Sequence, residues 1–224
     1  MLPRIVVHNA VSVDGRIDWF TPDVGQFYGL AARWKEDATL AGSDTIYNAE
    51  ESAAEEEDDI PEPPVVEADD ARPLLVVPDS RGGVHNWRQL RESGYWRDMV
   101  ALCAKKTPQT YRDYLDARYI HCIIAGEERV DLREALEELH ARVGVELVRV
   151  DSGGTLNGVL FRAGLVDEVS LLIHPSLVGG TSSRSMYRAP DLTTDEGVID
   201  LKLIHCEQLE NGVVWVRYEV IKEA

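Results

Sequence analysis

The chain has 224 residues, 44% of them apolar, and a formal net charge of −17. This length and apolar content suffice for one large domain, and no stretch approaches the roughly 18 unbroken apolar residues of a membrane span. The acidic balance argues against nucleic acid, because proteins that bind it present a basic face. We therefore expect a single domain over residues 1–224, in a cytoplasmic protein that binds neither nucleic acid nor membrane.

The first predicted strand covers residues 4–13, where an apolar run ends at the turn pair Asp14–Gly15. Three polar side chains interrupt the run: His8, Asn9 and Ser12. Polar groups in such a strand either find partners inside the core or line a cleft, and we favour the cleft.

A helix over 24–35 and a short strand over 38–41 follow, and the strand leads into the polar turn Gly42–Thr45. Residues 49–72 hold eleven acidic residues and one basic one, so much of the net charge lies there. Such a composition does not support a packed core and predicts a solvated, mobile insert within the domain.

The next strand, over 73–78, ends at a polar turn that contains Arg81, where a guanidinium can bind a phosphate with two hydrogen bonds. Residues 82–94 are predicted to form a mobile loop, and a strand covers 99–104.

A buried strand over 119–125 precedes Gly126. Asp131 and Glu134 have the spacing of a capping box, which predicts a helix that ends at Gly144. The strand over 145–150 then leads into a glycine pair and another helix. Alternating strands and helices of this kind indicate parallel crossover units.

Gly153 and Gly154 stand at the start of this last helix, whose apolar face is predicted to hold Leu156, Val159, Leu160 and Ala163. The first turn of a helix has unpaired N–H groups at the positive end of its dipole, so the turn can bind a phosphate. The same pattern also fits a tight turn without a ligand.

The pattern changes after Pro175. The segments 201–209 and 213–221 alternate around Asn211–Gly212, which predicts an antiparallel hairpin. The fold expected is therefore α/β, with a mostly parallel central sheet flanked by helices and closed by this hairpin. The apolar hairpin, with Trp215, is a candidate dimer interface.

The cysteines are Cys103, Cys122 and Cys206, and we expect buried thiols in a reducing compartment because their number is odd and their contexts are apolar. No Cys-x-x-Cys or His-x-x-x-His spacing supports a metal site, so none is expected.

Several short motifs follow one another along the chain in the same order as in a known family. They are Ser12–Arg16, Ala41–Thr45, Val77–Arg81, Gly153–Asn157 and Ala163–Glu168, followed by Gly179–Gly180. Together they are similar to the C-terminal reductase domain of the bifunctional riboflavin-biosynthesis deaminase-reductase, a relative of dihydrofolate reductase that also exists in free-standing form. The zinc deaminase motif is absent from this sequence, so we expect a free-standing reductase.

The resemblance implies NADPH-dependent reduction of the ribosyl group of a ribosylaminopyrimidine 5′-phosphate to ribityl, in a protein that is commonly a homodimer. The residues expected to bind the cofactor are Gly42, Ser43, Thr45, Ser80, Arg81, Gly126, Gly153, Gly154, Thr155 and Leu156. The substrate is expected at Asn9, Ser12, Asp14 and Gly180, and the candidate catalytic residues are Asp151, His8 and Asn9.

Two departures leave the substrate open. The family usually has a glutamate before its glycines, where this chain has Asp151 and Ser152, and the family's lysine or asparagine of the first strand aligns with His8. The alternatives are a dihydrofolate- or pterin-type reductase of the same fold, or a noncatalytic nucleotide-binding protein that engages a partner through the acidic segment.

Overall fold

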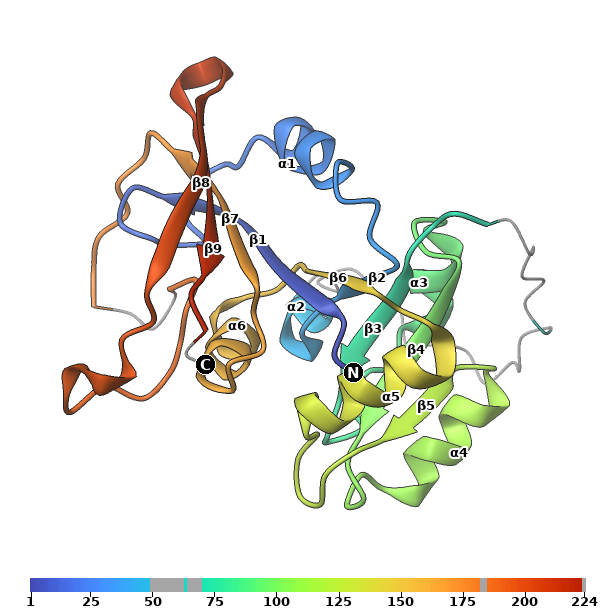
Figure 1. The fold of residues 1–224 in the computed structure, drawn as a ribbon. Helices are drawn as coiled ribbons and strands as arrows, with labels where there is room; N and C mark the ends of the chain where they lie inside the picture. Colours follow the sequence, from blue (N-terminus) through green and yellow to red (C-terminus); the bar gives the residue numbers. More distant parts are fainter. Residues whose placement is uncertain (49–62, 64–69, 182–184, 223–224) are drawn as a thin grey trace. The chain divides into compact units, whose positions relative to one another are not determined.

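The computed structural model describes residues 1–48, 63, 70–181 and 185–222 (Figure 1). The chain forms two compact units: the first contains residues 1–3 and 36–148, and the second contains 4–35 and 149–224. The expected single domain therefore stays a prediction. Most of the predicted acidic insert, 49–72, lies outside the described residues. None of the described helices combines the length and the apolar character that crossing a membrane requires.

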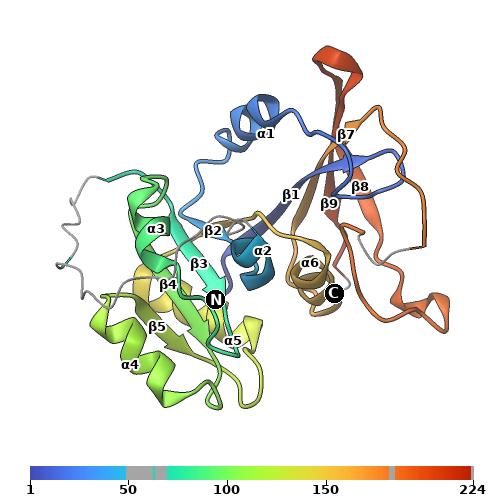
Figure 2. The same ribbon diagram turned by 180° about the vertical axis from the view of Figure 1, so that it is seen from behind.

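The first unit is built on four parallel strands in the order β5-β4-β3-β2. Their bounds are β2 (Ala38–Leu40), β3 (Leu74–Pro78), β4 (Asp98–Cys103) and β5 (His121–Ile124). The helices are α2 (Ser43–Asn48), α3 (Trp87–Glu92), α4 (Gln109–Ala117) and α5 (Leu132–Val143). Helices α4 and α5 pack beside β5, as Figures 1 and 2 show from opposite sides. Strands β2 and β4 are buried throughout, as expected for apolar strands of a parallel sheet.

The predicted mobile loop over 82–94 is wrong, because it contains α3. Trp87 of this helix is buried, and its Nε1 donates a hydrogen bond to the hydroxyl of Tyr111, 3.2 Å away. Tyr111 lies on α4, to which the sequence analysis assigned no element. Only Tyr111 and Leu115 of α4 are buried, so its apolar stripe is too short for a clear helical period.

Helix α5 begins and ends where the sequence predicts. The side chain of Asp131 accepts hydrogen bonds from the N–H groups of Arg133 and Glu134, and Gly144 has a left-handed conformation with φ of 75°. The reciprocal half of the capping box is not formed, because the Glu134 carboxylate accepts from the N–H of Gly126 at 2.8 Å. Glu134 therefore anchors the loop that follows β5 to the start of α5.

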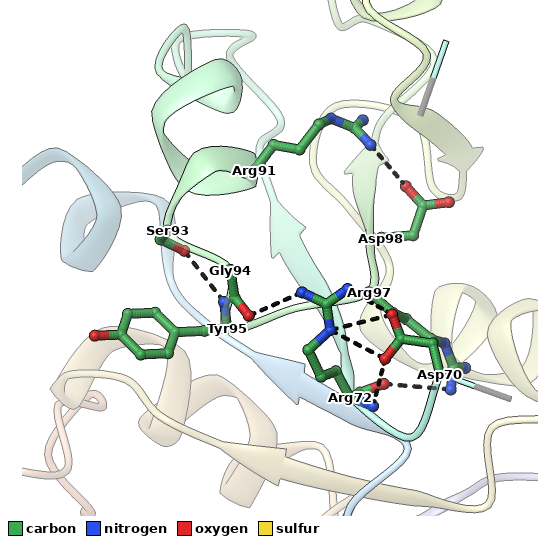
Figure 3. Close-up of polar contacts among 8 residues, drawn as sticks. All are labelled: Asp70, Arg72, Arg91, Ser93, Gly94, Tyr95, Arg97 and Asp98. Carbon is green, nitrogen blue, oxygen red and sulfur yellow. Dashed lines mark hydrogen bonds and ion pairs between the residues drawn. The ribbon is translucent and has the colours of Figure 1, made fainter. Parts of the chain in front are cut away.

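Polar contacts hold the amino ends of β3 and β4, as Figure 3 shows. The Asp70 carboxylate binds the guanidinium of Arg72, which also donates to the carbonyl of Gly94 at 2.9 Å. Arg91 and the mostly buried Asp98 form an ion pair of 3.6 Å. These contacts fix the point at which the chain enters β3.

The second unit contains strands in the order β1-β7-β9-β8. Strand β1 (Arg4–Ser12) is parallel to β7 (Glu168–His174), while β8 (Leu201–Gln208) and β9 (Val214–Val220) form the predicted antiparallel hairpin. Its helices are α1 (Val24–Ala31) and α6 (Gly154–Arg162), and short 3-10 turns cover Asp195–Gly197 and Glu210–Gly212. Strand β6 (Leu147–Val150) spans the division between the units. The predicted α/β class, with mostly parallel strands and a C-terminal hairpin, is confirmed.

Two expectations about single side chains are wrong. Trp215 is 1% exposed and packs with Phe27, Leu30 and Leu172, so it belongs to the core of its own unit and is not a surface residue of the hairpin. Cys206 is exposed, whereas Cys103 is buried as expected and Cys122 is half-buried.

Candidate functional site

The predicted site residues fall into two groups. Gly42, Ser43, Thr45, Ser80, Arg81 and Gly126 belong to the first unit, and all the others belong to the second. Those of the first unit follow β2, β3 and β5, which are parallel, so they lie at the carboxyl edge of their sheet. This is the edge at which α/β folds bind ligands.

The side chain of Arg81 lies beside the turn that follows β2. Its Nη2 lies 3.5 Å from Oδ1 of Asp44, which stands between Ser43 and Thr45 at the start of α2. The Arg81 side chain is 80% exposed, so the pair is screened by water and the guanidinium stays accessible to an anion.

Ser80 and the loop after Gly126 are also held together. The N–H of Val130 donates to Oγ of Ser80 at 3.0 Å, and Oγ1 of Thr107 donates to the Ser80 carbonyl at 2.9 Å. Gly126 has φ of 78°, and a Cβ there would lie 2.3 Å from the carbonyl oxygen of Arg129. Only glycine fits this close approach.

Asp79 is a residue of this edge that the sequence analysis did not single out. It is 3% exposed, and its carboxylate accepts hydrogen bonds of 2.7 to 2.9 Å from the N–H groups of Gly82, Gly83 and Val84. An aspartate whose carboxylate accepts hydrogen bonds from N–H groups three to five residues further along the chain stabilises a turn. It thereby fixes the segment that carries Ser80 and Arg81.

In the second unit, Asp14 joins the loop after β1 to the turn after β7. Its carboxylate accepts from Oγ of Ser12 at 2.6 Å and from the N–H groups of Val178 and Gly179 at 3.1 and 2.7 Å. The hydrogen bond from Ser12, followed by the two backbone N–H groups, holds the pKa of Asp14 well below its usual range. Arg16 donates to the carbonyl of Gly180. The structure therefore brings Ser12, Asp14 and Gly180 together.

His8 is fully buried, with its ring stacked on Phe27 at 4.3 Å. Its Nε2–H donates to the carbonyl of Phe27 at 3.1 Å, and its Nδ1 accepts from the hydroxyl of Ser170 at 2.9 Å. Burial lowers the pKa of His8 to about 3, so the ring is neutral. The Phe27 carbonyl can only accept a hydrogen bond, so the one ring proton lies on Nε2. Both ring nitrogens are engaged within the core, and we therefore assign His8 a structural role.

The buried His8 predicts an acid-sensitive fold. Its pKa is about 3 in the folded state and 6.5 in the unfolded chain, so the unfolded state binds the extra proton between these values. The stability that His8 contributes is complete above pH 6.5 and is lost as the pH falls, by about 2 kcal/mol at pH 5. Urea denaturation at several pH values should show this slope in the wild type and not in His8→Gln. Equal slopes in both proteins would contradict the burial of a neutral His8.

Asn9 faces away from His8, as neighbours in a strand do. Its Nδ2 donates to the carbonyl of Ser152 at 2.9 Å, and its Oδ1 accepts from Nδ2 of Asn157 at 2.8 Å. The side chains of Asn9, Ser12 and His8 thus all have hydrogen-bond partners within the protein. All three are buried, whereas the sequence analysis favoured a cleft lined by them. Asn9 nevertheless touches the turn that follows Asp151.

Asp151 precedes the glycine turn, and its side chain is 28% exposed. Its Oδ2 lies 3.1 Å from Nη1 of Arg149, which is almost completely buried. The buried guanidinium of Arg149 thus holds the Asp151 carboxylate in place, while this carboxylate remains partly exposed to solvent. Arg149 is a further residue that sequence reasoning missed, because its charge within an apolar run gave no sign of a partner.

The first turn of α6 has free donors. Its N-cap is Gly153, which has no side chain to accept a hydrogen bond. The N–H groups of Gly154, Thr155 and Leu156 donate to no acceptor in the described chain. Three free N–H groups at the positive end of a helix suit an anionic group such as a phosphate.

The buried face of α6 differs from the prediction. It contains Asn157, Gly158 and Leu160, whereas Val159 is 50% exposed and Ala163 is exposed. The reason is a close contact with residues Ser185–Arg188, here called the strap. A Cβ on Gly154 would lie 2.1 Å from the carbonyl oxygen of Ser185, and one on Gly158 would lie 2.1 Å from that of Arg188. In the sequence, this close contact could have been inferred only from Gly154 and Gly158, two glycines four residues apart on one face of the predicted helix.

In the described residues, no group of three or more His, Cys, Asp or Glu side chains is arranged to hold a metal ion.

The fold matches solved structures. A pyrimidine reductase-like protein from Corynebacterium diphtheriae superposes with a TM-score of 0.72 at 16% identity, over 99% of this chain and 93% of that chain. The RibD protein of Acinetobacter baumannii gives a TM-score of 0.69 at 17% identity, over 99% of this chain and 59% of the other. At these identities the likeness establishes the fold, and the expected dihydrofolate reductase-like class is confirmed.

Sequence relatives carry the comparison further. The 2,5-diamino-6-ribosylamino-4(3H)-pyrimidinone 5′-phosphate reductase of Methanothermobacter thermautotrophicus is 27% identical over 232 residues, covering 98% of this chain and 99% of that protein. The protein of the same name from Archaeoglobus fulgidus is 30% identical over 193 residues, covering 82% and 85%. The family model of the RibD C-terminal domain matches residues 3–215. The chain is therefore a member of the RibD C-terminal domain family.

Proposed function

We propose that the protein is an NADPH-dependent reductase that converts the ribosyl group of a ribosylaminopyrimidine 5′-phosphate to a ribityl group in riboflavin biosynthesis. The relatives that align with nearly the whole chain are named as reductases of such a substrate. The structural observation that carries the proposal is the first turn of α6. The three unpaired N–H groups that follow Gly153, those of Gly154, Thr155 and Leu156, suit a phosphate of the cofactor.

Each unit offers a different kind of group to a phosphate of the dinucleotide: backbone N–H donors in the second unit and a guanidinium in the first. In the second unit, the backbone donors of Gly154, Thr155 and Leu156 would hold it. In the first unit, the exposed guanidinium of Arg81 would bind a phosphate at the adenosine end, beside the polar turn that contains Ser43 and Thr45. A 2′-phosphate distinguishes NADPH from NADH, so Arg81 is the residue expected to set this preference.

NADPH, when bound, supplies a hydride for C1′ of the opened ribosyl group. The protein supplies positioning and polar partners. Asp151, held by Arg149, presents a carboxylate to the hydroxyl or amino groups of the substrate. Asp14 and Ser12 fix the turn that contains Gly180, where we place a further substrate contact. Asn9 fixes the backbone of Ser152 beside Asp151.

The direct test mixes the protein with NADPH and the ribosylaminopyrimidinone phosphate. NADPH fluorescence should fall only when the substrate is present, and mass spectrometry should find a product heavier by two hydrogen atoms. Turnover of dihydrofolate or a pterin, without turnover of the pyrimidine phosphate, would replace the proposed substrate. Failure of millimolar NADPH to raise the melting temperature would overturn the cofactor assignment.

Asp151→Asn should lower kcat/KM by at least about tenfold, because the amide keeps the shape of the side chain and loses its charge. Steady-state kinetics with the pyrimidine phosphate measure this effect. Asp195→Asn, at an exposed aspartate of a 3-10 turn, is the matched control and should retain wild-type kinetics. Equal activity of the two variants would exclude a catalytic role for Asp151.

We also propose that the protein is a homodimer that pairs through β8, which is the last strand in the order β1-β7-β9-β8. Leu201, Leu203 and Ile204 of β8 are 43%, 53% and 43% exposed. An exposed apolar edge strand of this kind favours association with another chain.

Replacing both Leu203 and Ile204 by lysine should convert the dimer to a monomer, because lysine charges at an edge strand oppose pairing. Sedimentation equilibrium measures the mass. Val143→Lys, at a 45% exposed position on α5, is the control and should leave the dimer intact. A monomeric wild type, or a double variant that remains dimeric, would rule out this interface.

A further inference from the structure

Asn157 is a completely buried polar residue of α6, in the second unit. Its Nδ2 donates to Oδ1 of Asn9 at 2.8 Å, to the carbonyl of Met186 at 3.0 Å and to the carbonyl of Ser152 at 3.2 Å. These three acceptors come from β1, from the strap and from the turn before α6. One amide group therefore joins three separate segments of the chain.

The orientation of this amide is determined by its neighbours. All three atoms around Nδ2 are acceptors, since Asn9 must itself direct Nδ2 toward the carbonyl of Ser152. Reversing the Asn157 amide would place its oxygen against three other oxygens. A side chain without N–H donors cannot replace it without leaving Oδ1 of Asn9 and the carbonyl of Met186 unpaired, while the carbonyl of Ser152 keeps its hydrogen bond from Asn9.

The strap depends on the same helix. The N–H of Arg188 donates to the carbonyl of Gly154 at 2.8 Å, and the N–H of Met186 donates to the carbonyl of Gly15 at 3.1 Å. Gly154 and Gly158 leave the space in which the strap lies. Asn157 stands between these glycines and is the side chain that ties the strap to β1.

We propose that Asn157 is a positioning residue of the reductase, which holds the Asp151–Gly154 turn in register with β1 and the strap. This inference rests on the proposed function and deepens it. Asn157 holds the carbonyl of Ser152, which in the sequence follows Asp151 and precedes the free N–H groups of α6. Loss of the amide shifts these two groups relative to each other, and a displacement of about 1 Å is enough to slow catalysis on the order of 100-fold.

The test uses Asn157→Asp, which preserves the shape. Its carboxyl group would face only acceptors in a buried site, which raises its pKa. The protonated form can donate one hydrogen bond, and the ionised form can donate none. We expect kcat relative to wild type to fall as the pH rises, toward a loss of about 100-fold, while the Kd for NADPH of the folded protein changes less than about threefold.

The matched control is Asn86→Asp, which also introduces a carboxyl group at a buried asparagine, 7% exposed, in the first unit. This control should alter the melting temperature without altering kcat. If Asn157→Asp behaves in the same way, with unchanged kcat at every pH, Asn157 is a purely structural residue and the proposal fails. A double-mutant cycle of Asn9→Ala and Asn157→Ala should be non-additive in kcat, because both residues act on Ser152, and additivity would also contradict the proposal.

Hydrogen exchange provides a readout that does not require activity. The amide N–H groups of Met186 and Arg188 should exchange at least about tenfold faster in Asn157→Ala than in wild type, at a temperature where both proteins are folded. Unchanged exchange would overturn the positioning role. A wild type that reduces no substrate, yet shows this difference in exchange, would refute the proposed function and leave the positioning role intact.

Discussion

Replacing Gly158 by alanine should lower the free energy of unfolding by about 2 to 3 kcal/mol, because the added Cβ has no room. It would lie 2.1 Å from the carbonyl oxygen of Arg188 and 2.6 Å from its carbonyl carbon. These are backbone atoms, so the strap must move away as a whole. Urea denaturation measures the loss, and hydrogen exchange of the strap should accelerate at the same time.

Gly29→Ala is the matched control, since Gly29 also lies in a helix, α1, with no atom within 4 Å of an added Cβ. Here alanine should stabilise the protein by about 0.5 to 1 kcal/mol through its higher helix propensity. If Gly158→Ala also stabilised the protein, the close contact between α6 and the strap would be refuted.

Arg217→Met should cost about 3 kcal/mol of stability. The carboxylate of Glu168 is 1% exposed and accepts from Nε of Arg217 and from Nη2 of Arg4, each at 2.6 Å. The Arg4 side chain is 57% exposed, whereas that of Arg217 is 27% exposed and also lies over the ring of Trp34 at 5.5 Å. Removal of Arg217 leaves the buried charge with its more solvated partner, which is strongly destabilising.

Glu168→Gln should cost less, about 1 kcal/mol, because the two arginines that remain can be solvated. The double variant Arg217→Met with Glu168→Met should recover part of the loss, since apolar side chains can replace a buried pair with little cost. Chemical denaturation of the three variants gives the comparison. A larger loss for Glu168→Gln than for Arg217→Met would contradict this account of the charge.

The strands and their order along the chain were predictable because they are short apolar runs between turn residues. Asn211–Gly212 predicted the hairpin correctly, since both residues adopt positive φ, 58° and 74°. Helices α3 and α4 were not predictable in the same way. The buried side of α3 contains only Trp87, and that of α4 contains only Tyr111 and Leu115, too few positions to establish a helical period.

The candidate site shows the same division. Asp14, Asp151 and the glycine turn were identified from their order and residue types, and the structure gives each of them defined partners. The sequence made both His8 and Asn9 candidate catalytic residues and favoured a cleft beside their strand. Alternation along β1 instead directs His8 to Phe27 and Ser170, and Asn9 to Ser152 and Asn157.

The sequence by itself determined the class of fold, the positions of its turns and the family. These depend on local apolar runs, glycines and the order of short motifs, all of which are properties of neighbouring residues. Only the tertiary structure decided which polar residues are structural and why Gly154 and Gly158 are glycines. Those answers depend on contacts between residues far apart in the chain, such as Asn157 with Asn9 and Gly158 with Arg188.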